Sequence, residues 1–362
     1  MIYVPMIKTR QEELKVFNEM SYCFSKNMLP LIEIINEIYE TRYKKDEKGE
    51  YVYNYSKKRK TKIKEEPTEE DIITLKEINK IIDGKMMFID YFRFSLKKYG
   101  KNIDIKKAGL SFDLNSNLDL YKKKLLETIR YSNMIPVVSI KNDCEFPKSN
   151  LIKFVLNLQE KTTHMALRIT ADWLDETKDI IGKLRASDFL LFDVEEQNPQ
   201  YKFVEIEELN DLKAECQIIL LNSPRKKDIK NGEYPEHDET DLINNCAKEV
   251  ASEYNLNGYG DYCGLKDAMP SNDGSNGKGA ALALLYDYNK NVFYSYCNHD
   301  TSKGMSGYTT LIPVIRSDEN ALNPDRDCPA YEKINSMSTA GNWATWHHIN
   351  AARYIHQTYK YM

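Results

Sequence analysis

Short apolar runs that end in a charged residue recur along the first two thirds of the chain. The clearest is the run at 189–192, four apolar residues followed directly by Asp193. An unbroken apolar run of this length is typical of a strand buried on both faces, as in a parallel sheet covered by helices. The pattern predicts eight strands, at residues 2–7, 28–35, 86–91, 135–140, 165–170, 189–194, 216–221 and 259–264.

Segments with apolar residues at helical spacing separate most of these strands. They lie at 11–24, 68–82, 118–131, 151–159, 175–184, 204–215 and 241–254. Alternating strands and helices with short connections predict a parallel sheet with right-handed crossovers. Charged residues end nearly every strand, and a closed barrel gathers all its strand ends at one mouth, whereas an open sheet binds mainly at one switch point. We therefore predict an α/β fold of the TIM-like (β/α)8 barrel type.

The last quarter of the chain has a different pattern. Residues 280–288 and 292–297 flank a short turn and predict a β-hairpin, beside which 308–315 forms a third strand. Residues 330–337 and 345–361 are expected to be helical. We expect a barrel over 1–268, and a hairpin with C-terminal helices over 269–362, packed on the barrel.

A charged insertion at 44–66 interrupts the strand–helix alternation. It contains the basic run 57–60 beside alternating tyrosines at 51–55, and we expect a small hairpin that faces solvent. Basic residues next to aromatic ones can bind nucleic acid. A solvated loop is the simpler interpretation, because Glu47, Glu50, Glu65 and Glu66 lie in the same segment.

Composition narrows the function classes. The chain has 362 residues, 41% of them hydrophobic, and a net charge of −4, which gives no global attraction to nucleic acid or anionic lipid. No apolar run approaches the roughly 20 residues that span a bilayer, and no secretory signal is visible, so we expect no membrane partner. Seven cysteines without CxxC spacing indicate free thiols and a reducing, cytoplasmic location.

In the predicted barrel, the charged strand ends converge at one mouth. We take Lys8, Glu33, Asp90, Arg168 and Asp193 as catalytic candidates and Lys141 as a ligand-binding residue. The three acids Glu33, Asp90 and Asp193 are candidate ligands for Mg²⁺ or Mn²⁺, and Lys8 and Arg168 are candidate partners of a phosphate. The alternative is a structural network, because buried charges need partners in any case.

Further ligand-binding candidates lie outside these strand ends. Ser223 and Arg225 follow the seventh strand, where barrels often bind phosphate, although a simple turn is the commoner structure there. Asp261 is either a ligand or a turn residue. His347 and His348 are adjacent on a predicted helix and point about 100° apart, so they cannot easily share one metal, and one of them is expected to be a packing residue. No dinucleotide or P-loop motif follows a strand, and Ser223 lacks the context of a nucleophile.

A resemblance to a known family rests on short motifs in a fixed order. They are Tyr3–Lys8, Pro30–Ile34, Ala166–Arg168, Asp193, Ser223–Pro224, Gly260–Tyr262, Gly341–Asn342 and His347–Ile349. In these the chain resembles the phage and bacterial beta family proteins. The resemblance implies a protein of phages, prophages or mobile elements that takes part in phage–host conflict, and it names no reaction. The insertion at 44–66 departs from the family pattern.

Two functional hypotheses follow. The first is a metal-dependent phosphoester hydrolase that acts on a nucleotide or nucleic acid at the barrel mouth. The second is a non-catalytic recognition protein in phage defence or counter-defence, which binds a phage or host protein through 269–362 and the charged insertion. The sequence leaves open whether the protein is an enzyme.

Overall fold

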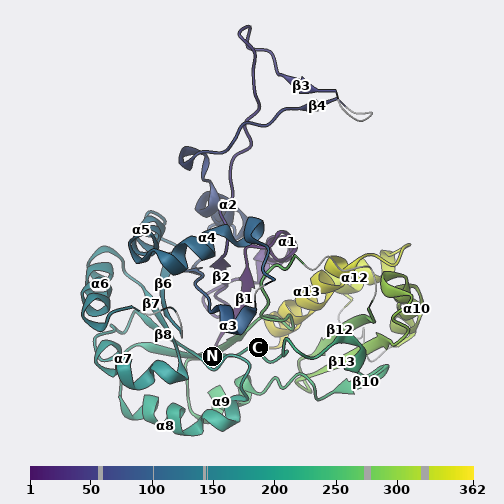
Figure 1. Ribbon diagram of the computed structural model, residues 1–362. Coiled ribbons are helices and arrows are strands. Elements are labelled where there is room, and N and C mark those ends of the chain that lie inside the picture. Colours follow the sequence, from purple (N-terminus) through teal and green to yellow (C-terminus); the bar gives the residue numbers. More distant parts are fainter. Residues whose placement is uncertain (56–59, 101, 142–143, 145, 273–278, 319–325) are drawn as a thin grey trace.

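The computed structural model describes residues 1–55, 60–100, 102–141, 144, 146–272, 279–318 and 326–362. Eight parallel strands close into a barrel in the order β1-β11-β9-β8-β7-β6-β5-β2 (Figure 1). Their bounds are β1 Ile2–Lys8, β2 Leu31–Ile34, β5 Met87–Tyr91, β6 Met134–Ile140, β7 Ala166–Thr170, β8 Phe189–Asp193, β9 Gln217–Leu221 and β11 Gly258–Asp261. The predicted TIM-like barrel is confirmed.

Helices cover the outside of the barrel. They are α1 Gln11–Glu19, α2 Thr74–Ile81, α3 Leu96–Tyr99, α4 Ile105–Ser116, α5 Leu118–Thr128, α6 Lys148–Lys161, α7 Leu174–Ile181, α8 Phe203–Asp211 and α9 Ala247–Glu253. Short 3₁₀ turns lie at Ser21–Cys23, Glu69–Asp71, Ala171–Trp173, Pro199–Lys202, Asn231–Glu233 and Gly304–Gly307. Helices α3 and α4, which follow β5, were not predicted from the sequence.

The apolar runs form strands because both faces of the barrel wall are buried. All five residues of β8 are buried, and inside the barrel the ring of Phe189 meets that of Phe88 edge-on at 4.9 Å. The closing strand β11 needs glycine for a steric reason. A Cβ on Gly260 would lie 2.5 Å from the carbonyl oxygen of Val4 in β1. The glycine thus lets β11 pair with β1 and complete the barrel.

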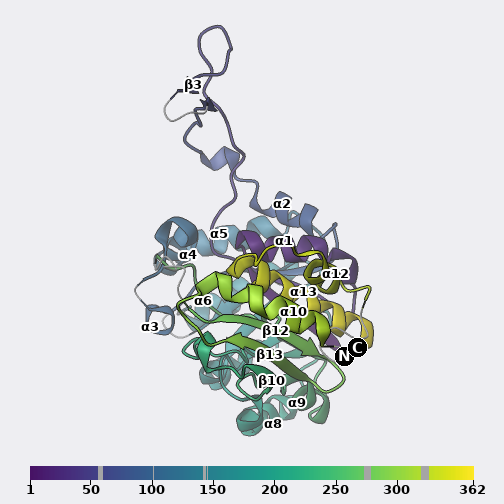
Figure 2. The same ribbon diagram turned by 90° about the vertical axis from the view of Figure 1, so that its right-hand side faces the viewer.

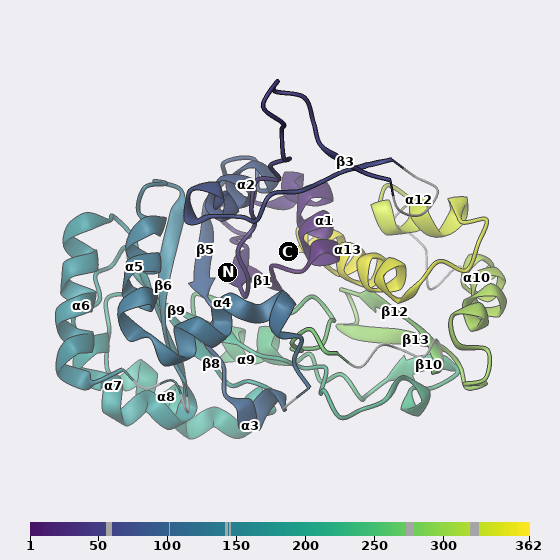
Figure 3. The ribbon, with the colours of Figure 1, turned by 45° about the horizontal axis from the view of Figure 1, so that its top comes forward.

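A second sheet lies beside the barrel. It has three antiparallel strands in the order β10-β13-β12, with bounds His237–Thr240, Val292–Asn298 and Ala281–Asp287. The helices α10 Tyr308–Ser317, α12 Pro329–Ser336 and α13 Trp343–Tyr361 accompany it. Figure 3 shows α13 running between the barrel and this sheet, and α13 packs on both β12 and α1.

The predicted third strand at 308–315 is wrong, because this segment is helix α10. Its buried residues Tyr308, Leu311, Ile312 and Ile315 recur at helical spacing, and this periodicity outweighs the β-branched composition that favours a strand. The third strand of the sheet is instead β10. It occupies the stretch before the predicted helix 241–254, of which only Ala247–Glu253 is α-helix.

The charged insertion forms an arm that projects from the barrel (Figure 2). Its strands β3 Tyr53–Asn54 and β4 Thr61–Lys62 pair antiparallel, so the predicted hairpin is present. The basic residues 57–59 lie outside the described residues.

No helix in the part of the chain that the structure describes combines the length and the apolar character needed to cross a membrane.

Candidate functional site

The charged strand ends of the sequence meet inside the barrel mouth. In the strand register Lys8 lies beside Glu33, and Glu33 lies beside Asp90. Because neighbouring strands place register partners side by side, these three side chains form one row across β1, β2 and β5. All three are buried.

The guanidinium of Arg168 connects the row to the opposite wall. Its Nη1 donates to Glu33 Oε1 at 2.6 Å and to Asp90 Oδ2 at 2.9 Å. Its Nε and Nη2 both donate to Asp193 Oδ2, at 2.9 and 2.6 Å. Arg168 is only 2% exposed. One buried arginine therefore contacts and holds three carboxylates from three strands.

Lys8 forms a second centre of the network. Its Nζ donates at 2.6 Å to both Glu33 Oε2 and Asp267 Oδ1. Asp267 follows β11, and it also accepts a hydrogen bond from the hydroxyl of Tyr99 at 2.7 Å and pairs with Lys98 at 2.9 Å. The segments around α3 and after β11 thus cover the mouth and bind to its charges.

The network lowers the pKa values of Glu33 and Asp267. Burial alone would raise the pKa of Glu33, but Lys8 and Arg168 outweigh it and lower this pKa to about 2. For Asp267 burial is likewise outweighed, by Lys8 and Lys98, and its pKa falls well below the usual range. Both carboxylates are ionised at neutral pH, each with a cation against it.

The mouth does not fit a metal ion. The three predicted ligands Glu33, Asp90 and Asp193 all contact Arg168, so a guanidinium fills the space among them. Among the described residues, no group of three or more His, Cys, Asp and Glu side chains is arranged to hold a metal. We therefore derive no chemistry through Mg²⁺ or Mn²⁺ here.

Lys141 lies beside the network without joining it by an ion pair. Its Nζ stands 4.1 Å from the ring centre of Phe92, and no carboxylate of the described residues lies within ion-pair distance. Burial, followed by the nearby charge of Arg168, lowers its pKa. Ser139, also at the mouth, donates to Asp90 Oδ2 at 2.7 Å, whereas the buried Oδ1 of Asp90 has no hydrogen-bond partner among the described residues.

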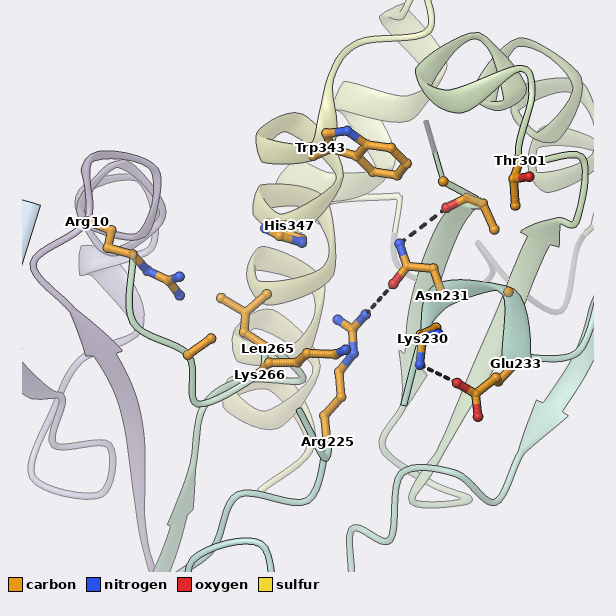
Figure 4. A pocket seen from close by; sticks show the side chains of 14 residues that line it. Arg10, Arg225, Lys230, Asn231, Glu233, Leu265, Lys266, Thr301, Trp343 and His347 are labelled. Atoms are coloured by element: carbon orange, nitrogen blue, oxygen red, sulfur yellow. Dashed lines mark hydrogen bonds between the residues drawn. The ribbon is translucent and has the colours of Figure 1, made fainter. Parts of the chain in front are cut away.

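A pocket of about 620 Å³ opens next to the mouth, between the barrel, the second sheet and α13 (Figure 4). This volume lies within the range of small-molecule sites. Its lining residues are Arg10, Arg225, Lys230, Asn231, Gly232, Glu233, Leu265, Lys266, Ala268, Gly279, Ala280, Thr301, Trp343 and His347. The segment after β11 separates the two regions, with Asp267 turned to the mouth while its neighbours Lys266 and Ala268 line the pocket.

The pocket wall is cationic. Four of its described lining residues are Lys or Arg, and Glu233 is the one carboxylate among them. Glu233 accepts a hydrogen bond from the backbone N–H of Lys230 at 2.7 Å. Lys266 donates from Nζ to the backbone oxygens of Lys227 and Ile229, and burial followed by the charge of Arg225 lowers its pKa to about 8.

Arg225 is the most unusual of these cations. It is 3% exposed, yet no carboxylate among the described residues lies within ion-pair distance. Its Nη1 and Nη2 make long bonds to Gly264 O at 3.3 Å and Asn231 Oδ1 at 3.4 Å, and its Nε has no partner in the described part of the chain. A buried guanidinium normally has an anion against it.

One side of the pocket is aromatic. Trp343, the first residue of α13, presents its ring to the cavity in Figure 4 and packs edge-on against Tyr308 at 5.6 Å. Its indole Nε1 is buried and has no hydrogen-bond partner among the described residues. With Leu265 and Ala280 it gives an apolar surface opposite the cations.

The other residues predicted from the sequence divide between these regions. His347 lines the pocket and keeps an exposed side chain, and desolvation, followed by the charges of Arg225 and Arg10, lowers its pKa. His348 is buried, contacts the carboxylate of Glu19 and lines a smaller adjoining pocket of about 230 Å³. Ser223 is buried outside the larger pocket's lining.

Asp261 is the last residue of β11, and its side chain points to the outside of the barrel, towards α13. It accepts hydrogen bonds from the hydroxyls of Tyr3 at 3.1 Å and of Tyr354 in α13 at 2.6 Å. Burial raises its pKa to about 6, although these hydrogen bonds act in the opposite direction. Asp261 thus fastens α13 to the barrel.

Sequence reasoning missed Tyr262, Asp267, Lys98 and Tyr99 at the mouth. For Tyr262 a signal was available. Side chains alternate across a strand, and Gly260 faces inward against Val4, so position 262 faces inward and Asp261 does not. Lys98 and Tyr99 lie in the four-residue helix α3 and Asp267 in the loop after β11, and no periodic pattern marks any of them.

Comparison with known proteins agrees with the resemblance in the sequence. The family model described as Beta protein matches residues 3–359. Comparison with the curated proteins gives no match. Among solved structures, the chain is similar to a dihydropteroate synthase from Anaplasma phagocytophilum with bound 6-hydroxymethylpterin-monophosphate. The identity is 11%, the TM-score 0.30, and the match covers 72% of this chain and 92% of that one. A likeness this distant carries no argument about function.

Proposed function

The chain belongs to the Beta protein family, and we propose that it binds a nucleotide-like ligand, an anion attached to a planar ring, in the pocket between the barrel and α13. The single observation that carries this proposal is Arg225, a buried guanidinium that faces a pocket without a carboxylate partner among the described residues. A bound phosphate would supply the missing anion and accept a bidentate hydrogen bond.

The remaining walls support a ligand with two ends. Lys266 lines the same cavity and adds positive charge around a phosphate, whereas Arg10, also in the lining, is already paired with Glu13. Trp343 offers a ring face for stacking, which suits an aromatic base. Inorganic phosphate alone would leave this aromatic wall uncovered.

The proposed ligand is still a nucleotide, as in our first hypothesis, but its binding site is the pocket and not the barrel mouth. Metal-dependent hydrolysis at the strand ends lacks support, because Arg168 occupies the carboxylates that would hold the metal. Recognition of a nucleotide, without chemistry, suits a protein of phage defence or counter-defence. The seven free cysteines are compatible with a reducing, cytoplasmic setting.

Thermal unfolding tests the proposal directly. The purified protein is melted with orthophosphate and with the mono-, di- and triphosphates of adenosine, guanosine, cytidine and uridine. A ligand that binds only the folded state adds about 2.7 kcal/mol of stability at one hundred times its Kd. We expect at least one nucleotide to raise the melting temperature of the wild type and of Lys226→Met, but not of Arg225→Met.

Lys226 is the matched control, since it is exposed and lies outside the lining of this pocket. Both substitutions remove one positive charge from adjacent positions. The proposal fails if no nucleotide shifts the wild type, or if Arg225→Met responds as the wild type does.

A further inference from the structure

The projecting arm, residues 43–64, carries a surface that neither the mouth nor the pocket uses. Isolated bridges Tyr43–Lys64 and Lys45–Tyr51 extend the β3–β4 pairing and bring three segments of the arm together. None of the described residues of the arm is buried. Figures 1 and 2 show it standing clear of the barrel, so its side chains contribute nothing to the core.

Tyrosines and lysines interleave on one face of the arm. Tyr51, Tyr53 and Tyr55 alternate along one segment, and alternate residues of a strand share a face. From the paired segment, Lys62 Nζ lies 3.6 Å from the ring centre of Tyr51, and Lys60 Nζ lies 4.0 Å from that of Tyr53. Aromatic rings and ammonium groups therefore alternate over a continuous exposed surface.

These ammonium groups have no carboxylate partner in the part of the chain that the structure describes. No carboxylate of the described residues lies within ion-pair distance of Lys45, Lys60 or Lys62, whereas other exposed lysines, such as Lys15 with Glu12, are paired. In the sequence the arm contains nine Lys and Arg residues against three Asp and Glu, in a chain of net charge −4. The arm is thus a local positive surface on an acidic protein.

We propose that this face of the arm binds single-stranded nucleic acid. Tyrosine rings would stack on unpaired bases, and the neighbouring lysines would contact the phosphates between them. Stacking is sequence-tolerant because every base has a π-face, and single-strand binding sites combine it with a positive track along the backbone. An acidic protein would satisfy the lysines but leave exposed rings such as Tyr55, which is 75% accessible, without a matching surface.

The distance of the arm from the barrel favours the same partner. Charges separated by more than about 8 Å are largely screened at physiological ionic strength, so the overall acidity of the protein is weakly felt at a projecting tip. The proposal is independent of the pocket, because it rests on different residues and different elements.

Fluorescence anisotropy with labelled 20-nucleotide oligo(dT) and oligo(U) tests the proposal in the full-length protein. The stacking variant is Tyr51→Ala with Tyr53→Ala, and the charge variant is Lys60→Gln with Lys62→Gln. We expect each to bind at least tenfold more weakly than the wild type. In the charge variant, the slope of the logarithm of affinity against the logarithm of salt concentration should become shallower by about 1.4, which is roughly 0.7 for each lost phosphate contact.

The matched control is Tyr201→Ala with Lys153→Gln, which removes an exposed tyrosine and an exposed lysine from the barrel helices. It should bind as the wild type does. The melting temperatures of the arm variants should stay unchanged, since none of the four substituted residues is buried. Absence of oligonucleotide binding by the wild type, or equal weakening in the control, overturns the proposal. So does binding of polyglutamate in place of oligonucleotides, which would assign the arm to an acidic protein.

Discussion

The barrel mouth and the pocket beside it use the same kinds of residue in opposite ways. At the mouth, Arg168 and Lys8 each contact at least two carboxylates, and the groups are buried. In the pocket, Arg225 is equally buried and has no carboxylate against it among the described residues. A charge that is already neutralised holds the fold together, whereas one left without a partner indicates a missing ligand.

Removing the central cation of the mouth should have the largest effect. In Arg168→Met, Glu33, Asp90 and Asp193 stay buried and lose their shared partner. Breaking a buried ion pair from one side costs about 3–5 kcal/mol. We expect a loss of at least this size in chemical denaturation, and a loss below about 1 kcal/mol would show that the network is not structural.

The equivalent change in the pocket should barely affect folding. Arg225→Met removes a buried charge that lacks an anion, and methionine fills similar space with apolar atoms. We expect the free energy of unfolding to change by less than about 1 kcal/mol, in either direction. Denaturation of Arg168→Met and Arg225→Met side by side measures the contrast, and equal destabilisation would remove the distinction between the two regions.

Two buried acids should make the free energy of unfolding depend on pH in opposite directions. The pKa of Glu33 is lowered to about 2, so its stabilising contribution is present above pH 4.5 and is lost as the pH falls towards 2. The pKa of Asp261 is raised to about 6, so its contribution is present below pH 3.8 and is lost as the pH rises through 6.

Asp261→Asn isolates the second effect. Between pH 4 and pH 7 the wild type should lose roughly 2–3 kcal/mol relative to this variant, because a shift of one pKa unit corresponds to about 1.36 kcal/mol. Urea denaturation at both pH values checks it. A difference between the two proteins that does not change with pH would contradict the assignment.

A further prediction concerns which part of a ligand the aromatic wall contacts. Trp343→Ala should weaken binding of a nucleotide about five- to one-hundredfold, as expected for a lost stacking contact of 1–3 kcal/mol, and should leave orthophosphate binding unchanged. Trp343→Phe should retain most of the affinity. Calorimetric titration of the wild type and both Trp343 variants with nucleotide and with orthophosphate measures these affinities. Trp173→Ala is the control, because Trp173 lines a different pocket.

The sequence predicted the fold more fully than it predicted the site. Unbroken apolar runs such as 189–192 reveal buried parallel strands because burial on both faces requires them. The same argument brought Glu33, Asp90, Arg168 and Asp193 together correctly. It could not show that Arg168 would form ion pairs with all three acids, because that depends on the exact direction of each side chain.

The pocket could not have been predicted as a unit. Its walls come from the loop after β1, the segments after β9 and β11, and the start of α13, which lie far apart in the chain. Arg225 and His347 were identified singly as candidates, whereas Lys266 and Asn231 carry no local signal. The error at 308–315 has a similar origin, because its composition favours a strand and its burial spacing favours the helix that forms.

A crystal structure of the protein with a nucleotide that raises its melting temperature would test the central claim most directly. We predict density in the pocket, with the phosphate against Arg225 and the base on Trp343, and an unchanged Arg168 network. A nucleotide bound at the strand ends, with Arg168 released from Glu33 and Asp193, would contradict the account and return the active region to the barrel mouth.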